Sequence, residues 1–419
     1  MRIDTGPKKI KKGNPFSFPL ADARIIEEIL TRGVKAIYPS RKALEEALKA
    51  GKRLKIYNGI DPSNPNIHLG NAIPLRKMRQ LQNLGHRAIL LIGDFTGRIG
   101  DPSDKGAMRL QLSHQQVLEN AKTYKKQAAK ILDFKSKINP CEIKFNSEWL
   151  DKLSNKEVVK LSGYFTVQQL IERNLFQKRL KEKKPIGLHE FLYPLYQGYD
   201  SVAMDIDMEI GGDDQTFNML IGRDLMKIYK NKEKFILTAP ILEGFDGRKM
   251  SKSWGNVINI TDSADDMFGK VMSLPDDLII KYFTLCTSVP LKEINKMEED
   301  LRSDKINPKD AKAKLGREIV GTYHGRKAAQ IAEKEFERIF KEKKLPKKIA
   351  EAKIKEKTLN ILDLLVKTKL ASSKSEAKRL ILQGGVKIDG KIKSDWKKTI
   401  EIKKGLVIQV GKRKFIKLN

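Results

Sequence analysis

The sequence holds little cysteine and no long apolar segment. Its 419 residues include two cysteines, Cys141 and Cys286, which stand far apart and form no CxxC or Cys/His ligand pattern. A disulfide framework and a structural zinc site are therefore not indicated, and a reducing cytosol fits this usage. No apolar run approaches the roughly 18 residues that span a bilayer, and the chain does not begin with the apolar core of a signal peptide. We expect a soluble cytoplasmic protein that is not exported and contacts no membrane.

Acidic residues are also in the minority. Lys and Arg number 83 against 52 Asp and Glu, which gives a formal net charge of +31. This charge favours a polyanionic partner, nucleic acid first, although composition alone equally allows a merely solvated basic surface. The chain should form two or three domains, because a single core rarely grows beyond about 250 to 300 residues.

The order of the segments predicts an α/β protein with a Rossmann-like parallel sheet. A strand near Leu54 is followed by a helical pattern that stops at Gly85 and by an apolar strand over 88–92. Such strand, helix, strand units build parallel sheets. Alternation over 204–210 predicts another strand, which runs into Gly211-Gly212 in a sharp loop where we expect a site.

The remainder of the chain reads as helices followed by a small basic α+β module. The last 63 residues carry 17 Lys and Arg against 5 Asp and Glu, in the order helix, second helix, Gly384-Gly385 turn and short strands. We predict a catalytic domain over 1–260, a helical domain over 261–344, a Lys-rich linker over 345–356 and the basic module over 357–419.

The tetrapeptide His-Leu-Gly-Asn, from His68 to Asn71, stands where a strand gives way to a helix. Free backbone N–H groups and the helix dipole favour phosphate there, and Gly70 allows a nucleotide to approach the backbone closely. His68 can donate a hydrogen bond to a phosphate oxygen. Taken alone, His68 is also explained as a capping or core histidine.

A second element, Lys249-Met250-Ser251-Lys252-Ser253, lies between Gly247 and Gly255. Its two ammonium groups can close over the β- and γ-phosphates of a nucleotide and neutralise charge that builds in the transition state. Taken alone, the same residues are also explained as a solvated charge run.

In this order, the two elements resemble the HIGH and KMSKS signatures of class I aminoacyl-tRNA synthetases. The KMSKS match over 249–253 is complete, whereas Asn71 replaces the second histidine of HIGH. An amide still donates to phosphate, so we expect activity to persist with a different geometry. The resemblance implies ATP, as Mg-ATP, for a co-substrate, with no tightly bound cofactor and no metal site of the protein itself. The implied catalytic residues are His68, Asn71, Lys249 and Lys252, and the implied ATP contacts are Gly59, His68, Gly70, Asn71, Gly212, Asp214, Lys249, Ser251 and Lys252.

The neighbouring segments resemble tyrosyl-tRNA synthetases over most of the chain, from about Leu54 to Ile416. Residues 57–63, Tyr-Asn-Gly-Ile-Asp-Pro-Ser, look like the family's strand that meets the substrate phenol, and 191–200 look like its pocket helix. Tyr193, Gln197 and Asp200 are spaced i, i+4 and i+7, so they share one helical face. Without their partners, they would be satisfied polar residues of an amphipathic core helix.

The resemblance assigns roles to individual residues. Tyr57 and Asp200 would meet the phenolic hydroxyl, and Tyr193, Gln197 and Asp101 the ammonium. Residues 211–215 resemble the GGSDQ loop, in which Asp214 would accept from the ribose and Gln215 would face the carboxylate and α-phosphate. Asp213 stands where serine is usual, and we expect it to point to solvent rather than to engage a cation. The implied tyrosine contacts are Tyr57, Asp61, Thr96, Asp101, Tyr193, Gln197, Asp200 and Gln215.

The module over 357–419 resembles the small RNA-binding domain of the S-four type, named after a ribosomal small-subunit protein. Lys374, Lys378 and Arg379 would face phosphates from one helix, with an affinity that falls steeply with salt. Charge alone also allows a basic surface with no ligand. The resemblance further implies that the helical domain lies on the anticodon side, and that a homodimer binds tRNA(Tyr) across both subunits.

The sequence therefore predicts an enzyme that converts L-tyrosine and ATP to tyrosyl-adenylate and transfers tyrosine to the 3′-terminal adenosine of tRNA(Tyr). A tryptophanyl-tRNA synthetase would share the fold and both signatures, but is expected to lack the basic module and the pairing of Tyr57 with Asp200. A catalytically silent RNA-binding relative is the alternative from another class. The retained lysines, His68 and the pocket residues argue against it.

Overall fold

The structure is a computed structural model that describes residues 22–101, 112–251, 254–340, 349–411 and 414–419. The chain divides into two compact units. The first contains the described residues up to Asp262 together with Leu274–Ala311, and the second contains Ser263–Ser273 and the described residues from Lys312 onward.

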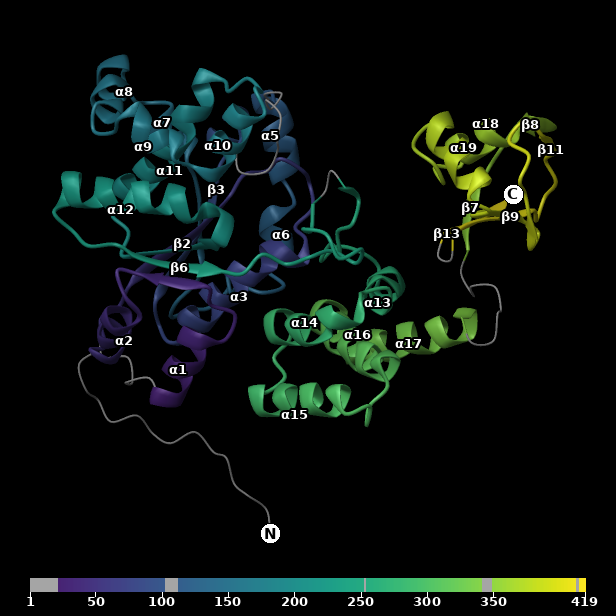
Figure 1. Cartoon of the computed structure of the whole chain (residues 1–419), viewed down its shortest axis with the longest axis horizontal. Coiled ribbons are helices and arrows are strands. Elements are labelled where there is room, and N and C mark those ends of the chain that lie inside the picture. Colours follow the sequence, from purple (N-terminus) through teal and green to yellow (C-terminus); the bar gives the residue numbers. More distant parts are fainter. Residues whose placement is uncertain (1–21, 102–111, 252–253, 341–348, 412–413) are drawn as a thin grey trace, which may run out of the picture. The chain divides into compact units, whose positions relative to one another are not determined.

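A six-stranded sheet forms the centre of the first unit (Figure 1). The strand order is β1-β6-β5-β2-β3-β4; β1 is antiparallel to β6, and all other neighbours are parallel. The α/β class that the sequence predicts is confirmed. The strands are β1 (Ala36–Tyr38), β2 (Lys55–Ile60), β3 (Arg87–Ile92), β4 (Glu142–Phe145), β5 (Met208–Gly212) and β6 (Phe235–Ala239).

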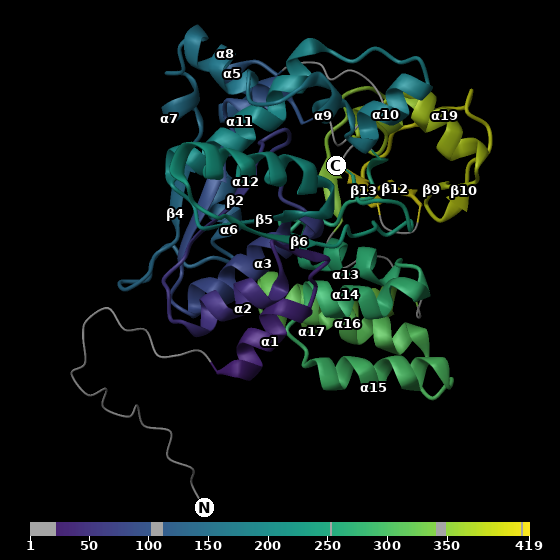
Figure 2. The same cartoon turned by 60° about the vertical axis from the view of Figure 1, so that its left-hand side comes forward.

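Helices cover both faces of this sheet (Figures 1 and 2). On one face α12 (Thr216–Lys230) packs against β5 and β6, and α11 (Leu188–Met204) packs against α12. On the other face α3 (Leu69–Asn83) packs against β2, β3 and β5. A sheet covered in this way needs apolar residues on both faces, and β3 accordingly buries every residue after Arg87. The other helices of this part are α1 (Ala23–Thr31), α2 (Arg41–Lys49), α4 (Thr96–Ile99), α5 (His114–Ala121), α6 (Tyr124–Ala128), α7 (Ser147–Leu150), α8 (Asn155–Ser162), α9 (Val167–Ile171) and α10 (Asn174–Lys181).

Strand β5 is shorter than its alternating sequence predicts. Met204 is the last residue of α11, and Asp205, with a left-handed φ of 50°, ends that helix. The strand begins at Met208 and ends at Gly212, just before a short 3-10 turn over Asp213–Gln215. The predicted sharp loop after the strand is thus confirmed, whereas the predicted start of the strand is wrong.

Strands β2 and β5 separate at their carboxyl ends. Their pairing covers Ile56 with Met208 and Tyr57 with Glu209, whereas β2 pairs with β3 along its whole length. The sheet also changes its direction of growth here, because β3 and β4 lie on one side of β2 while β5 and β6 lie on the other. Ligands of parallel α/β sheets bind at such switch points, outside the carboxyl ends of the strands.

Residues 263–340 are helical, as their strand-free pattern predicts. In the first unit, the buried guanidinium of Arg32 donates to four carbonyl groups at the carboxyl end of α14, those of Phe283, Thr284, Thr287 and Val289. In the second unit, α13 packs against α17. The predicted helical domain over 261–344 thus contributes to both units. The helices are α13 (Ala264–Met272), α14 (Ile279–Cys286), α15 (Leu291–Arg302), α16 (Pro308–His324) and α17 (Arg326–Phe340).

Residues 350–418 form an α+β module with its own apolar core. Its main sheet has the order β10-β9-β12-β13-β7, and β8 pairs with β11. The predicted order of helix, helix, glycine turn and short strands is confirmed, except that strand β8 comes before the first helix. Strand β7 falls inside the predicted linker over 345–356 and pairs in parallel with β13, while residues 345–348 lie outside the described part. The elements are β7 (Ala350–Ala352), β8 (Thr358–Asn360), α18 (Ile361–Lys367), α19 (Lys374–Leu382), β9 (Val386–Ile388), β10 (Lys391–Ile392), β11 (Thr399–Glu401), β12 (Val407–Val410) and β13 (Lys414–Leu418).

Two further features bear on the expectations from composition. Cys141 and Cys286 are both buried and carry free thiols. Among the helices of the described residues, none combines the length and the apolar composition that crossing a membrane requires.

Candidate active site

A pocket of about 780 Å³ opens where β2 and β5 separate. The segments that line it come from β2, β3 and β5 and the loops after them, from α3 and α11, and from the chain after β6. Every predicted ATP or tyrosine contact in the described part of the chain lines this pocket, whereas Lys252 lies outside that part. The lining residues are Tyr57, Gly59, Asp61, His68, Gly70, Asn71, Thr96, Asp101, Tyr193, Gln197, Asp200, Gly212, Asp214, Gln215, Lys249 and Ser251.

Tyr57 and Asp200 line this pocket although both are buried, with exposures of 0% and 2%. Asp200 accepts hydrogen bonds from Nε1 of Trp149 (2.7 Å) and Nδ2 of Asn146 (3.2 Å). Burial holds the pKa of Asp200 well above its usual range, although these two donors oppose the shift. Burial, assisted by the carboxylates of Glu209 and Asp200, also raises the pKa of Tyr57. This region offers a hydroxyl and a carboxyl group to a polar substrate atom.

Asp61 forms the centre of a second polar cluster in the pocket. Its carboxylate accepts from the hydroxyls of Tyr193 (2.9 Å) and Thr96 (2.7 Å). Gly93 leaves the room for this arrangement, because a Cβ there would lie 2.0 Å from Oδ1 of Asp61 and 2.4 Å from Oγ1 of Thr96. Sequence reasoning missed Gly93, since nothing in its own neighbourhood reveals that close approach.

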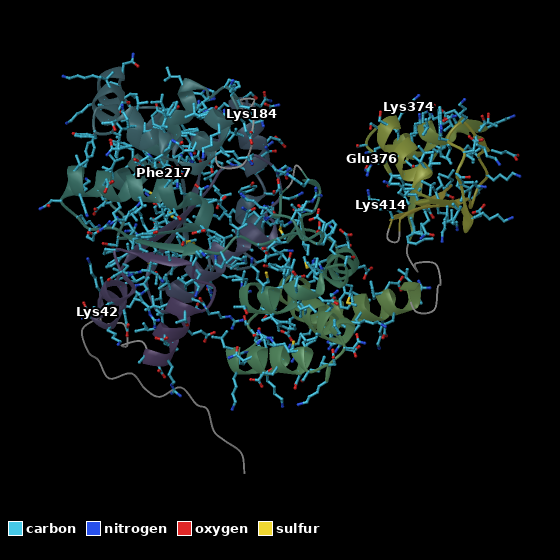
Figure 3. All side chains as sticks on the ribbon, in the orientation of Figure 1. Lys42, Lys184, Phe217, Lys374, Glu376 and Lys414 are labelled. Carbon is cyan, nitrogen blue, oxygen red and sulfur yellow. The ribbon has the colours of Figure 1, made fainter. Side chains whose placement is uncertain are left out.

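Asp101 already has a buried cationic partner. Nη2 of Arg173 donates to Oδ1 (2.9 Å), and Nε2 of Gln215 donates to Oδ2 (2.5 Å). The guanidinium of Arg173 also lies 6.0 Å from the ring centroid of Phe217, which is labelled in Figure 3. Arg173 was missed because its partner is 72 residues away in sequence and no local pattern links the two.

The predicted polar face of the pocket helix is confirmed as geometry, because Tyr193, Gln197 and Asp200 all line the pocket from α11. Nε2 of Gln197 donates to Oε1 of Glu209 (3.1 Å), and its Oε1 accepts from Nδ2 of Asn218 (2.9 Å). Asn218 also donates to Oε1 of Gln215 (3.0 Å). Sequence reasoning missed both Glu209, which connects the pocket helix to β5, and Asn218, which connects it to the loop after β5.

His68 is the N-cap of α3. Its Nδ1 accepts from the backbone N–H of Asn71 (3.3 Å), and Oδ1 of Asn71 accepts from the backbone N–H of His68 (3.4 Å). A neutral ring whose Nδ1 accepts carries its hydrogen on Nε2, as a donor. A Cβ at Gly70 would lie 3.1 Å from this ring. The capping interpretation is therefore confirmed, and the same histidine also lines the pocket.

The lysine loop meets the loop after β5 through an ion pair. Nζ of Lys249 lies 3.2 Å from Oδ2 of Asp214. The buried Asn256, which sequence reasoning missed, holds this loop from behind: its Oδ1 accepts from the backbone N–H of Ser251 (2.8 Å) and its Nδ2 donates to Asp246 (2.7 Å). Asp213 is half-buried and does not line the pocket. No group of three or more His, Cys, Asp or Glu side chains suited to a metal ion occurs in the described part of the chain.

The C-terminal module presents its basic residues at the surface. Lys374, Lys378 and Arg379 are exposed on α19, where Lys374 pairs with Asp363 (2.7 Å). The ammonium of Lys378 lies 4.1 Å from the ring centroid of Trp396. Figure 3 labels Lys374 and Lys414 on this module.

These features place the protein in a known class of enzymes. Residues 49–341 match the family described as tRNA synthetases class I (W and Y), so the chain belongs to the class I aminoacyl-tRNA synthetases. Residues 340–418 match the tyrosine--tRNA ligase SYY-like C-terminal domain. The family described as class I (W and Y) contains enzymes for tryptophan and enzymes for tyrosine. Comparison with individual relatives shows to which of the two this chain belongs.

The tyrosine--tRNA ligase of Moorella thermoacetica is 47% identical over 395 residues, which cover 93% of this chain and 95% of that protein. The tyrosine--tRNA ligase of Thermotoga maritima is 46% identical over 393 residues, covering 94% and 96%. The chain therefore belongs to the tyrosyl-tRNA synthetases, a family of ligases, and the resemblance drawn from its motifs is confirmed.

Solved structures agree at the level of the fold. A C-terminally truncated mitochondrial tyrosyl-tRNA synthetase of Aspergillus nidulans has a TM-score of 0.64 at 23% identity and covers 75% of this chain and 94% of its own. The tyrosyl-tRNA synthetase of Archaeoglobus fulgidus, complexed with L-tyrosine, has a TM-score of 0.59 at 20% identity and covers 74% and 100%. At sequence identities this low, the structural similarity is evidence for the fold alone.

Proposed function

We propose that this pocket activates L-tyrosine with ATP and that the protein then transfers the tyrosyl group to the 3′-terminal adenosine of tRNA(Tyr). One observation carries the proposal: the buried residues Tyr57 and Asp200 line the same pocket as described residues of both signature elements. A side chain that ends in a hydroxyl would meet the pair, while ATP would contact the signatures.

The tyrosine contacts follow from the chemistry of the lining groups. The phenolic hydroxyl pairs with Tyr57 and Asp200, and the ammonium with Tyr193, Gln197 and a carboxylate. Two carboxylates are available for the ammonium, and their hydrogen bonds differ. Asp61 accepts from hydroxyl groups, whereas Asp101 also accepts from the cationic Arg173. Thr96 positions Asp61, and Gln215 faces the substrate carboxylate and the α-phosphate.

The nucleotide contacts surround the ends of β2 and β5. Gly59, Gly70 and Gly212 allow the nucleotide to approach the backbone, and Asp214 accepts from the ribose hydroxyls. The phosphates lie against His68 and Asn71, since Nε2–H and the amide NH₂ are both donors. Lys249, Ser251 and Lys252 belong to the loop that contacts the β- and γ-phosphates. ATP enters as its Mg²⁺ complex, in which the ion is part of the substrate.

The mechanism is mainly positioning and electrostatics. The α-carboxylate of tyrosine is ionised at neutral pH, so its attack on the α-phosphorus needs no general base from the protein. The bond to pyrophosphate breaks as the carboxylate oxygen bonds to phosphorus, and the two lysines neutralise the charge that develops on the leaving group. Tyrosyl-adenylate then remains bound until a ribose hydroxyl of the tRNA displaces the adenylate.

The assembly, the location and the domains are also part of this proposal. The exposed basic face of α19 supports an RNA-binding role for Lys374, Lys378 and Arg379. Membership of the tyrosyl-tRNA synthetase family supports a homodimer. The cytoplasm suits a protein that acts on tRNA and carries two free thiols. Residues 1–260 act as the catalytic domain, 261–344 contact the anticodon side, 345–356 connect, and 357–419 bind RNA.

The test is exchange of labelled pyrophosphate into ATP, with tyrosine, tryptophan or phenylalanine as the amino acid. We expect exchange with tyrosine alone. Lys249→Ala should lower the rate by about 10²- to 10³-fold, the effect of removing one group that stabilises a transition-state charge. Lys227→Ala, an exposed lysine of α12 outside the pocket, is the matched control and should keep the wild-type rate. Exchange with tryptophan, or none by a folded protein, would refute the proposal.

A further inference from the structure

A buried ion pair lies behind the tyrosine pocket. Lys234, directly before β6, is 0% exposed, and its ammonium contacts the carboxylate of Glu209 on β5. Glu209 lines the pocket, whereas Lys234 does not. Burial lowers the pKa of Lys234, and the charge of Glu209 opposes that shift. Buried ion pairs seldom add stability over an apolar pair, because desolvation opposes their attraction. The position of this pair next to a substrate site therefore suggests a role in that site.

The helices above the sheet leave room for the ammonium. A Cβ at Gly222 of α12 would lie 2.5 Å from Nζ of Lys234 and 3.2 Å from Oγ of Ser201. Gly198 on α11 faces Gly222, and a Cβ at Gly222 would lie 3.2 Å from its Cα. The close approach of the two helices and the reach of Lys234 thus depend on the same glycine.

The first branch of the network leads to Tyr57. Nζ of Lys234 donates to Oγ of Ser201 (3.0 Å), which lies 3.1 Å from the hydroxyl of Tyr57. All three side chains are fully buried. An ammonium has donors only, so Ser201 accepts from Lys234 and its own hydrogen can be directed to the oxygen of Tyr57. Tyr57 then accepts from Ser201 and keeps its own hydrogen for another acceptor: the carboxylate of Glu209 is one, and a bound phenolic oxygen would be a second.

The second branch leads to Gln197. Oε1 of Glu209 accepts from Nε2 of Gln197 (3.1 Å). Because a carboxylate only accepts hydrogen bonds, the amide nitrogen of Gln197, and not its oxygen, must face Glu209. The carbonyl oxygen of Gln197 then faces the amide of Asn218 and has a second lone pair, which suits an ammonium group.

We infer that Lys234 and Glu209 are positioning residues that set the direction of the hydrogen bonds at both ends of the bound amino acid. Tyr57 donates to the phenolic oxygen through the Ser201 branch, and Gln197 presents its oxygen to the ammonium through the Glu209 branch. The inference rests on the proposed function, since it takes tyrosine as the occupant. Phenylalanine offers no oxygen to Tyr57. The ion pair of Lys234 and Glu209 therefore contributes to the preference for tyrosine over phenylalanine.

The experiment compares tyrosine with phenylalanine in pyrophosphate exchange for Ser201→Ala, Lys234→Met and Lys234→Gln. The ratio of kcat/KM for tyrosine to that for phenylalanine should fall about tenfold in Ser201→Ala, because roughly one hydrogen bond is lost. It should fall further in Lys234→Met. The KM for ATP should stay unchanged. Lys234→Gln should recover part of the ratio, because an amide still donates to Ser201.

Arg179→Met is the control for loss of a buried ion pair. Arg179 and Glu190 are 0% and 1% exposed, and neither lines the pocket. This variant should lower the thermal midpoint and leave the ratio unchanged. If the Ser201→Ala and Lys234→Met proteins fold and keep the wild-type ratio of kcat/KM for tyrosine over phenylalanine, this inference is overturned while the proposed function stands. If Lys234→Met does not fold, the result for Ser201→Ala decides. A wild-type protein with no tyrosine-dependent exchange would instead refute the proposed function.

Discussion

Among the described residues, the first unit buries several charged side chains, whereas the C-terminal module buries none. From residue 350 onward, the buried side chains are apolar except that of Thr368. The lysines of the module lie on its surface instead, as Figure 3 shows for Lys374 and Lys414. The buried charged side chains of the first unit include Arg32, Lys77, Arg173, Arg179, Glu190, Asp200, Glu209 and Lys234.

This difference separates two ways of recognising a ligand. A buried charge must be paired or hydrogen-bonded, so a few partners fix its position, and such groups select a small substrate by geometry. Exposed lysines follow a phosphate backbone with little geometric demand, and salt screens them. We therefore expect substrate selection and acid sensitivity to reside in the first unit, and salt sensitivity in the module.

Among the variants that test this comparison, the largest effect is expected from disturbing the buried geometry without removing a polar group. In Gly93→Ala, the new methyl group would overlap Asp61, whose carboxylate must then leave the hydroxyls of Thr96 and Tyr193. Misplacing a substrate-binding group by about 1 Å can cost on the order of 10² in rate, and we expect kcat/KM for tyrosine to fall by that factor. Pyrophosphate exchange measures it.

The control for this variant is Gly163→Ala. A Cβ at Gly163 would make ordinary contacts, 3.4 Å from the carbonyl oxygen of Lys160 and 3.5 Å from that of Val159, and Gly163 does not line the pocket. We expect this variant to exchange at the wild-type rate. If Gly93→Ala did the same, the geometry around Asp61 would not limit the reaction.

Glu209 illustrates what the sequence could and could not predict. Helical spacing is local, so the shared face of Tyr193, Gln197 and Asp200 was predictable from spacing alone. The alternation around Glu209 suggests a strand with one polar face, yet β5 is covered on both faces and Glu209 is 3% exposed. Its partner Lys234 lies 25 residues further along, across an intervening helix. Only the packed fold identifies such a pair.

The module shows the converse case. Its two helices, glycine turn and strands follow from periodicity, because its core is apolar and its lysines are outside. Strand β7 was still missed: Ala350–Ala352 stands in a Lys-rich stretch without alternation, and its pairing with β13 spans more than sixty residues of sequence. Pairing between distant segments leaves little trace in either one alone.

An intermediate effect is expected from acid. Burial lowers the pKa of His86 to about 4, from an ordinary value of 6.5, and its Nδ1 accepts from the backbone N–H of Leu54 (3.2 Å). The unfolded chain therefore takes up this proton first, and stability is lost as pH falls from 6.5 towards 4. At pH 5.5 the loss is about 1.4 kcal/mol, or about tenfold in the folding equilibrium. Urea unfolding at a series of pH values, followed by circular dichroism, measures it.

His86→Gln removes this titration. The variant is expected to be less stable at pH 7.5, yet its stability should depend less steeply on pH between 6.5 and 5 than that of the wild type. His114→Gln changes an exposed histidine on α5 and should keep the wild-type slope. Equal slopes in the wild type and His86→Gln would show that the buried histidine is not a source of acid sensitivity.

The smallest effect is expected from a single exposed charge of the module. Lys378→Ala removes an ammonium group of α19 that lies beside the ring of Trp396. Its loss should weaken tRNA binding a few-fold. It should also reduce the steepness with which log affinity falls against log salt concentration, by about one. Pyrophosphate exchange needs no tRNA and should not change. The matched control is Lys403→Ala, an exposed lysine of the same module that lies between β11 and β12 and pairs with Glu401 (3.1 Å). A greater loss with Lys378→Ala would assign the contact to the α19 face. Equal losses would mean that the total charge of the module, and no particular face, holds the RNA.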